Sequence, residues 1–174
     1  DFPDNIEDAD YSDNNLVTVG YLARFDAVKG TDRLVNLAKE ILPSNEVEFR
    51  VAGWGEYQVE EMSVLENKYD NFHVVGKLPH KEVFSFLSEL DVLFFPSRKE
   101  GMGRAVIESL YTGTPAIVWD IPALNEIVHE KKFVIDSVED AMRLINNREF
   151  KSELAWFDYT NYTVEEEMDK IEEL

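Results

Sequence analysis

Short apolar runs alternate along the chain with longer amphipathic segments. The runs are rich in β-branched and aromatic residues, which is typical of strands buried on both faces. They predict strands at 16–20, 47–52, 72–75, 91–95, 114–118 and 133–135. Between the runs, apolar residues recur at the spacing of one helix face. This pattern predicts helices at 31–42, 58–68, 81–90, 104–111, 122–129 and 138–146, with two further helical pieces after residue 146.

Local signals refine two of these helices. Thr31 stands where a hydroxyl can cap the first helix, and Pro43 stands just past its last apolar position. In the second helix, Val59, Met62 and Leu65 follow each other at a spacing of three residues. We therefore expect all three to face inward.

Strands that alternate with helices at short spacing indicate βαβ units and a parallel sheet. The sequence therefore predicts an α/β, Rossmann-like three-layer sandwich with a parallel sheet of about six strands. Residues 16–174 form the domain in this interpretation, and the polar residues 1–15 form a linker or tail. Ligands of such open sheets bind outside the carboxyl ends of the strands. We expect chemistry in the loops that follow Val19, Ala52, Val75, Phe95 and Val118.

The formal charge of −19 at pH 7 is unevenly distributed. Residues 1–15 carry −6 and residues 163–174 carry −5, which leaves −8 for the rest of the chain. A chain this acidic is expected to repel nucleic acid and anionic membranes, because phosphate contacts require clustered basic residues. An anionic small ligand would need a local positive site. Each cation at the predicted ligand edge is therefore informative.

Composition also limits the metal and membrane chemistry to be expected. There is no cysteine, which excludes disulfides and thiolate sites, and the three histidines are scattered. We therefore expect no metal site. No apolar run approaches the roughly 20 residues of a membrane-spanning helix, so no transmembrane segment is expected.

The segment 96–108, PSRKEGMGRAVIE, joins a predicted buried strand to a predicted helix. Its two glycines, Gly101 and Gly103, let the backbone approach a ligand closely, and the free N–H groups at the start of a helix attract anions. Glu100 and Glu108 could flank a phosphate-sized gap, which would suit a nucleotide-sugar with hydroxyls at both ends. The alternative is that Glu100 only complements the helix dipole and that Glu108 faces solvent.

The segment 23–30, ARFDAVKG, follows the first predicted strand. Arg24 offers a planar, bidentate fork and Lys29 a point charge, and this pair suits a diphosphate. The alternative is that both are surface cations that balance an acidic chain.

Four blocks, taken in order, carry a resemblance to a known family. They are ARFDAVKG at 23–30, VAGWGE at 51–56, VVGKLPHKEV at 74–83 and FFPSRKEGMGRAVIESLYTGTPAIV at 94–118. Together they resemble the C-terminal domain of the retaining glycosyltransferases of family 4, which have the two-domain GT-B fold. The most specific part is the E-x7-E motif formed by Glu100 and Glu108. Where the family usually shows a Gly-Gly turn after Asp120, this chain has Ile121-Pro122-Ala123.

The resemblance implies a role for each matching position. Arg24 and Lys29 would bind the donor diphosphate, and Glu100 would touch the donor sugar near its reacting face. Glu108 would accept the ribose hydroxyls. The implied backbone contacts are those of Leu78 with the base and those of Gly101, Met102, Gly103 and Arg104 with sugar and phosphate oxygens.

The resemblance also implies partners and a setting. The donor would be a nucleoside diphosphate sugar, no metal or other cofactor would be required, and an N-terminal domain missing from this chain would bind the acceptor. We expect a cytoplasmic hexosyltransferase of polysaccharide biosynthesis, with any membrane contact made through the missing domain. Two alternatives are a sugar-nucleotide 2-epimerase of the same fold and a non-catalytic acidic interaction module.

The remaining aromatic and histidine residues are interpreted as structural. Trp54, Trp119 and Trp156 are expected to pack in the interior, although Trp54 could lie near the nucleotide. His73 is expected at the surface or packed, and His80 in the turn before a helix.

Overall fold

The computed structural model describes residues 16–150. The predicted linker at 1–15, the two terminal helical pieces and Trp156 lie outside the described residues. Within the described part, no helix combines the length and the apolar character that a membrane span requires.

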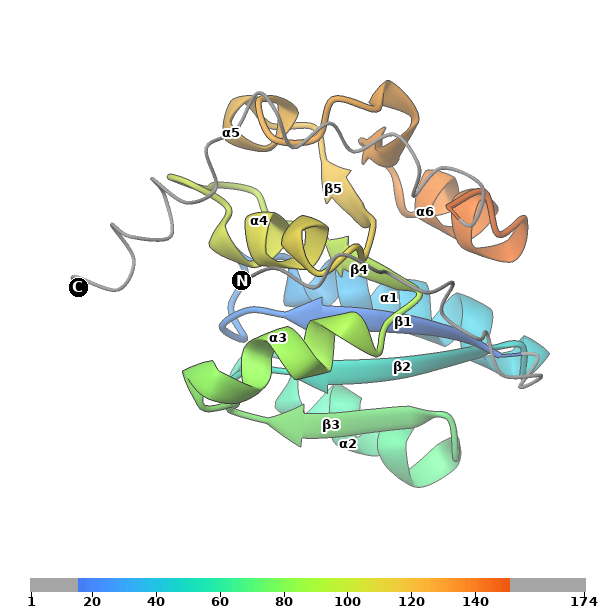
Figure 1. Ribbon diagram of the computed structural model, residues 1–174. Coiled ribbons are helices and arrows are strands. Elements are labelled where there is room, and N and C mark those ends of the chain that lie inside the picture. The colour runs from blue at the N-terminus through green and yellow to red at the C-terminus, as the bar shows by residue number, and fades with distance from the viewer. Residues whose placement is uncertain (1–15, 151–174) are drawn as a thin grey trace.

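The centre of the molecule is one parallel sheet, as the sequence predicts (Figure 1). Its order is β3-β2-β1-β4-β5-β6, and every pairing is parallel. All four residues of the central strand β4 are buried, which accounts for its uninterrupted apolar sequence. The strands are β1 (Val17–Leu22), β2 (Val47–Ala52), β3 (Phe72–Gly76), β4 (Val92–Phe95), β5 (Ala116–Trp119) and β6 (Val134–Ile135).

Helices cover both faces of this sheet and complete the three-layer sandwich. On one face α1 contacts both α2 and α6, and on the other α3 packs against α4 (Figure 1). The helices are α1 (Thr31–Ile41), α2 (Val59–Lys68), α3 (His80–Ser88), α4 (Arg104–Tyr111), α5 (Pro122–Asn125) and α6 (Val138–Asn146), with short 3₁₀ turns at Leu42–Ser44 and Lys131–Phe133.

Three local predictions are wrong. Thr31 does not cap α1, because Gly30 occupies the cap position with a φ of 73° and the Thr31 hydroxyl is directed to other partners. Val59 is 40% exposed, so the inward face of α2 begins one turn later, at Met62. The helix after Pro122 ends at Asn125, and the chain then turns to bury two successive residues, Ile127 and Val128.

Candidate functional site at the carboxyl edge of the sheet

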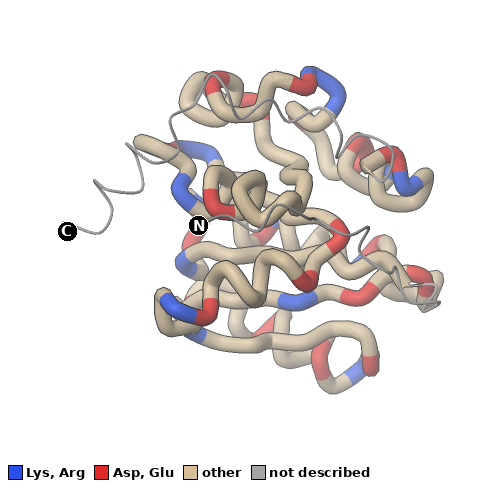
Figure 2. Tube along the Cα trace, viewed as in Figure 1, with Lys and Arg blue, Asp and Glu red and all other residues tan. Residues whose placement is uncertain are grey.

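The strand order reverses beside β1. The chain leaves β1 for β2 and β3 on one side, and then returns to β4 on the other side. The loops 23–30 and 96–103, which follow β1 and β4, therefore leave the sheet on the two sides of this reversal. In open α/β sheets such a reversal opens a ligand crevice. Figure 2 shows that basic positions are frequent at this end of the sheet, toward which the strand arrowheads of Figure 1 point.

These two loops are held tightly together. A Cβ atom at Gly30 would lie 2.2 Å from the carbonyl oxygen of Pro96, so only glycine allows this approach. The backbone N–H of Arg98 donates to the Val28 carbonyl at 2.7 Å. The Arg98 guanidinium also forms a two-pronged ion pair with Asp32, with both N–O distances 2.7 Å.

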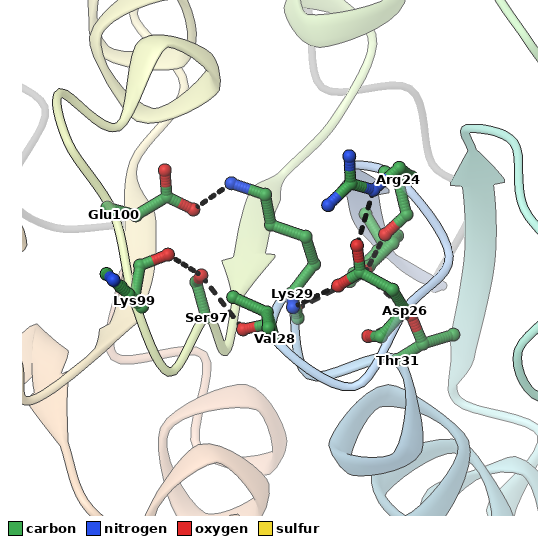
Figure 3. A network of polar contacts seen from close by, with 9 residues as sticks. Arg24, Asp26, Val28, Lys29, Thr31, Ser97, Lys99 and Glu100 are labelled. Carbon is green, nitrogen blue, oxygen red and sulfur yellow. Dashed lines mark hydrogen bonds and ion pairs between the residues drawn. The ribbon is translucent and has the colours of Figure 1, made fainter.

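An ion pair crosses between the same loops. Lys29 Nζ lies 2.6 Å from Glu100 Oε1 (Figure 3). The Glu100 side chain is only 8% exposed and that of Lys29 is 24% exposed. The structure thus brings together two predicted site residues that are far apart in the sequence.

Arg24, the third predicted charge of this group, is held by Asp26. The Asp26 carboxylate accepts hydrogen bonds from Arg24 Nε and, at 2.7 Å, from the backbone N–H of Lys29 (Figure 3). Partial desolvation opposes ionisation of Asp26, but the hydrogen bonds from Lys29 and Arg24 and their positive charges lower its pKa below the ordinary value. Asp26 therefore stays charged at neutral pH, and the terminal nitrogens of the 56% exposed Arg24 side chain remain available to a ligand.

The buried side chain of Tyr21 holds the loop after β1 in place through hydrogen bonds. The Tyr21 hydroxyl lies 3.0 Å from Thr31 Oγ1 and 3.3 Å from the Lys29 carbonyl oxygen. Burial raises the pKa of Tyr21, so it is a neutral hydroxyl at every physiological pH. Since Thr31 in turn donates to the Asp26 carbonyl at 3.1 Å, one small network fixes the loop that carries Arg24 and Lys29.

The loop after β4 leads into α4 through glycine. Gly101 and Met102 are exposed, whereas Gly103 is buried and adopts a φ of 69° as the residue before the helix. A Cβ atom at Gly103 would lie 2.7 Å from Leu124 Cδ2, so the start of α4 packs closely on α5. Arg104 is the first residue of the helix and is exposed.

Glu108 is buried on α4, so the interpretation that it faces solvent is wrong. Its Oε1 lies 3.8 Å from His80 Nε2 and 3.9 Å from Arg104 Nη2, beyond hydrogen-bonding distance. Burial raises the pKa of Glu108, and the nearby Arg104 and His80 only partly offset this. His80 opens α3, two residues after the partly buried Leu78. The predicted residues thus form two groups: Glu100 faces Lys29, whereas Glu108 faces α3.

A comparison with known protein families identifies the chain. The family model described as glycosyl transferases group 1 matches residues 4–150. This chain belongs to that family.

A curated relative is also a glycosyltransferase by name, and solved structures share the fold. An uncharacterized glycosyltransferase of Methanocaldococcus jannaschii is 30% identical over 143 residues, which cover 77% of this chain and 40% of that protein. The C-terminal domain of a group 1 glycosyl transferase from Francisella tularensis matches with a TM-score of 0.66 and 20% identity, over 80% of each chain. Anabaena HepE, solved with UDP and glucose, matches with a TM-score of 0.71 and 16% identity, over 91% of this chain and 48% of that one. The fold is that of the C-terminal half of a GT-B glycosyltransferase.

Sequence reasoning missed several residues of this candidate site. Asp26 and Tyr21 received no role, although Asp26 stands between the two predicted phosphate-binding cations. His80 was expected only to serve a turn, and its proximity to Glu108 depends on how α3 packs against α4. The interior packing predicted for Trp54 is wrong, because this residue is 53% exposed. Trp119 packs as expected, under the Arg33 guanidinium at 3.6 Å.

Proposed function

We propose that this chain is the donor-binding part of a retaining glycosyltransferase, which transfers a hexose from a nucleoside diphosphate sugar to an acceptor hydroxyl. The observation that carries the proposal is the Lys29–Glu100 contact across the strand-order reversal. It places a cation and a carboxylate side by side at the position where open α/β sheets bind ligands. The cation can pair with a phosphate of the donor, and the carboxylate can accept hydrogen bonds from the hydroxyls of the donor sugar.

The diphosphate is assigned to Arg24, Lys29 and the start of α4. Arg24 keeps its terminal nitrogens available while Asp26 occupies Nε, so the guanidinium can form a fork with phosphate oxygens. The backbone amides of Met102, Gly103 and Arg104 add the N–H groups and the dipole of a helix N-terminus. Together these groups neutralise the leaving diphosphate, and no metal is part of the proposal.

The ribose is assigned to Glu108 and the base to the backbone of Leu78. Glu108 is a largely buried carboxylate whose two cationic neighbours lie beyond hydrogen-bonding distance, and a ribose diol would supply it with two donors. Leu78 lies in the loop between β3 and α3, next to the helix whose first residue contacts Glu108. The two assignments therefore place one nucleoside along the junction of α3 and α4.

The sugar is assigned to Glu100. Lys29 forms an ion pair with this carboxylate. On donor binding we expect Lys29 to turn to the diphosphate and Glu100 to turn to the sugar hydroxyls. As the glycosidic bond breaks, Glu100 stabilises the oxocarbenium-like sugar, and the cations stabilise the departing diphosphate. Exposed Gly101 leaves room for the sugar beside Glu100. The acceptor, here a growing polysaccharide, would be held by the other half of the enzyme.

A thermal-shift screen against uridine, guanosine and adenosine diphosphate sugars tests the proposal. A ligand present at 100 times its dissociation constant should stabilise the chain by about 2.7 kcal/mol. We expect at least one of these donors to raise the melting temperature, and its free nucleoside to do so far less. If no nucleoside diphosphate sugar raised it, the proposed function would be wrong.

A further inference from the structure

The loop after β2 presents an exposed tryptophan on a backbone that is fixed from both sides. Trp54 is 53% exposed. Its carbonyl accepts the N–H of Phe25, in the loop after β1, at 2.6 Å, and the N–H of Gly53 donates to the carbonyl of Gly76, at the end of β3, at 2.8 Å. Trp54 therefore lies between the loop assigned to the diphosphate and the loop assigned to the base.

The glycines on either side of Trp54 show how closely this loop is packed. A Cβ atom at Gly53 would lie 1.9 Å from the Ala23 carbonyl oxygen, and one at Gly55 would lie 2.3 Å from the Phe25 carbonyl oxygen. The backbone thus has one path, whichever side chain stands between the glycines. An indole that is more than half exposed gains little from burial, so core packing gives no reason for tryptophan here.

A lysine from the next loop covers one face of this indole. Lys77 Nζ lies 5.2 Å from the centre of the Trp54 ring, within the range of a cation–π contact. Lys77 directly precedes Leu78, the residue assigned to the base. The contact links the ring to the loop assigned to the base, and the indole is still 53% exposed, so a planar partner could stack on it.

We propose that Trp54 and Lys77 form a stacking subsite for the base of the nucleotide donor. This inference rests on the proposed function and extends it to residues outside the phosphate and ribose contacts. Every nucleobase has a π face, so stacking on an indole provides affinity without choosing among bases. The subsite therefore takes purines and pyrimidines alike, and the choice of base lies with the Leu78 backbone.

The test is a calorimetric titration of the 174-residue chain with UDP, GDP, ADP and inorganic pyrophosphate. Trp54→Ala should weaken the binding of whichever nucleoside diphosphates bind by about tenfold or more, since base–aromatic stacking contributes free energy of this order. Binding of pyrophosphate, which has no base, should not change. Trp54→Phe should restore most of the affinity. Val64→Ala, which removes an exposed apolar side chain from α2, is the control and should have no effect.

A second variant tests the lysine. Lys77→Met should weaken nucleoside diphosphate binding by about two- to fivefold, as loss of an exposed cation–π contact implies. In the Trp54→Ala background the same change should have almost no effect, because the two side chains act through one contact.

Each other result overturns the inference. Unchanged nucleoside diphosphate affinity in Trp54→Ala would remove the stacking role, and an equal loss for pyrophosphate would mean that the loop had merely moved. If wild type bound no nucleoside diphosphate, the proposed function would fall as well. Binding that depends on Arg24 but not on Trp54 would leave the proposed function standing and reject only this subsite.

Discussion

The burial of Glu108 destabilises the folded chain at neutral pH. Burial disfavours the charged form of a carboxylate, which is why the pKa of Glu108 is raised. The folded chain therefore holds a proton that the unfolded chain releases. Between the ordinary glutamate pKa and the raised value, the free energy of unfolding falls as pH increases.

Glu108→Gln should consequently be more stable than wild type at pH 7. The amide carries no charge, so the stabilisation should disappear as the pH falls below the ordinary glutamate pKa. Urea unfolding at pH 7 and pH 4 measures this difference as a change in the free energy of unfolding. In a thermal scan at the same pH values, each kcal/mol corresponds to about 2–4 °C in melting temperature for a domain of this size. The same variant should bind nucleoside diphosphates more weakly. A variant less stable than wild type at pH 7 would mean that Glu108 is stabilised by its neighbours.

Glu100 should behave differently, because its partner is Lys29. Glu100→Gln releases Lys29 without altering the ribose contacts, so affinity for a nucleoside diphosphate should be unchanged or higher. Turnover of the full-length enzyme should fall by about 10²-fold or more, since charge stabilisation at the reacting sugar is lost. Steady-state kinetics and calorimetry on the same variant separate the two effects. Wild-type turnover would remove Glu100 from the chemistry.

Among the elements, the loops after β1 and β4 matter most for the site, and their contact depends on Gly30. The residue combines a φ of 73° with a carbonyl oxygen 2.2 Å from where a Cβ would stand. Gly113 has a similar φ of 81° but open space around it. The two glycines therefore separate the cost of backbone conformation from the cost of steric overlap.

Gly113→Ala should lower the free energy of unfolding by about 1–2 kcal/mol, the penalty of a left-handed conformation. Gly30→Ala should lower it by about 2–5 kcal/mol, because the methyl group must also displace the Pro96 backbone. Chemical denaturation of both variants measures this. Equal losses in the two variants would show that the Pro96 backbone can move away from residue 30 at no cost.

The sequence predicted which helices and strands form more accurately than where each of them begins and ends. Within residues 16–150 the apolar runs identify each strand, because a sheet covered on both faces buries most residues of its central strands, and all four of β4. The cap at Thr31 was wrong because a tertiary contact, the Tyr21 hydroxyl, uses its side chain. Periodicity placed Val59 inward, but the inward face of α2 starts at Met62. Such outcomes depend on what lies beneath a helix, which a single segment does not encode.

The candidate site, too, could be predicted only in part from the sequence. Glycines and charges on loops after strands mark the ligand edge of an α/β sheet, so Arg24, Lys29 and Glu100 are candidates from their positions, and their roles come from the family resemblance. The pairing of Lys29 with Glu100 follows from the strand order, which brings β4 beside β1. The supporting roles of Asp26 and Tyr21 need side-chain geometry that no spacing reveals.

At the scale of the whole molecule, the chain corresponds to a minor part of the M. jannaschii relative and to the C-terminal half of the GT-B fold. We predict that the 174-residue chain alone forms no glycoside. Positioning the acceptor next to the anomeric carbon accounts for about 7–11 kcal/mol of barrier lowering, and that positioning is assigned to the other half of the enzyme. Incubation with donors and a broad acceptor panel checks this. A product whose formation depends on Glu100 would contradict it.

The central claim is that Arg24 and Lys29 bind the diphosphate of a nucleotide donor. Calorimetric titration of wild type, Arg24→Ala and Lys29→Ala with a nucleoside diphosphate and its free nucleoside tests it most directly, with Lys39→Ala, at the far end of α1, as the charge control. Each site variant should lose about 1.5–3 kcal/mol of binding free energy for the diphosphate and almost none for the nucleoside. Equal losses for both ligands, or equal losses in the Lys39 control, would contradict the account.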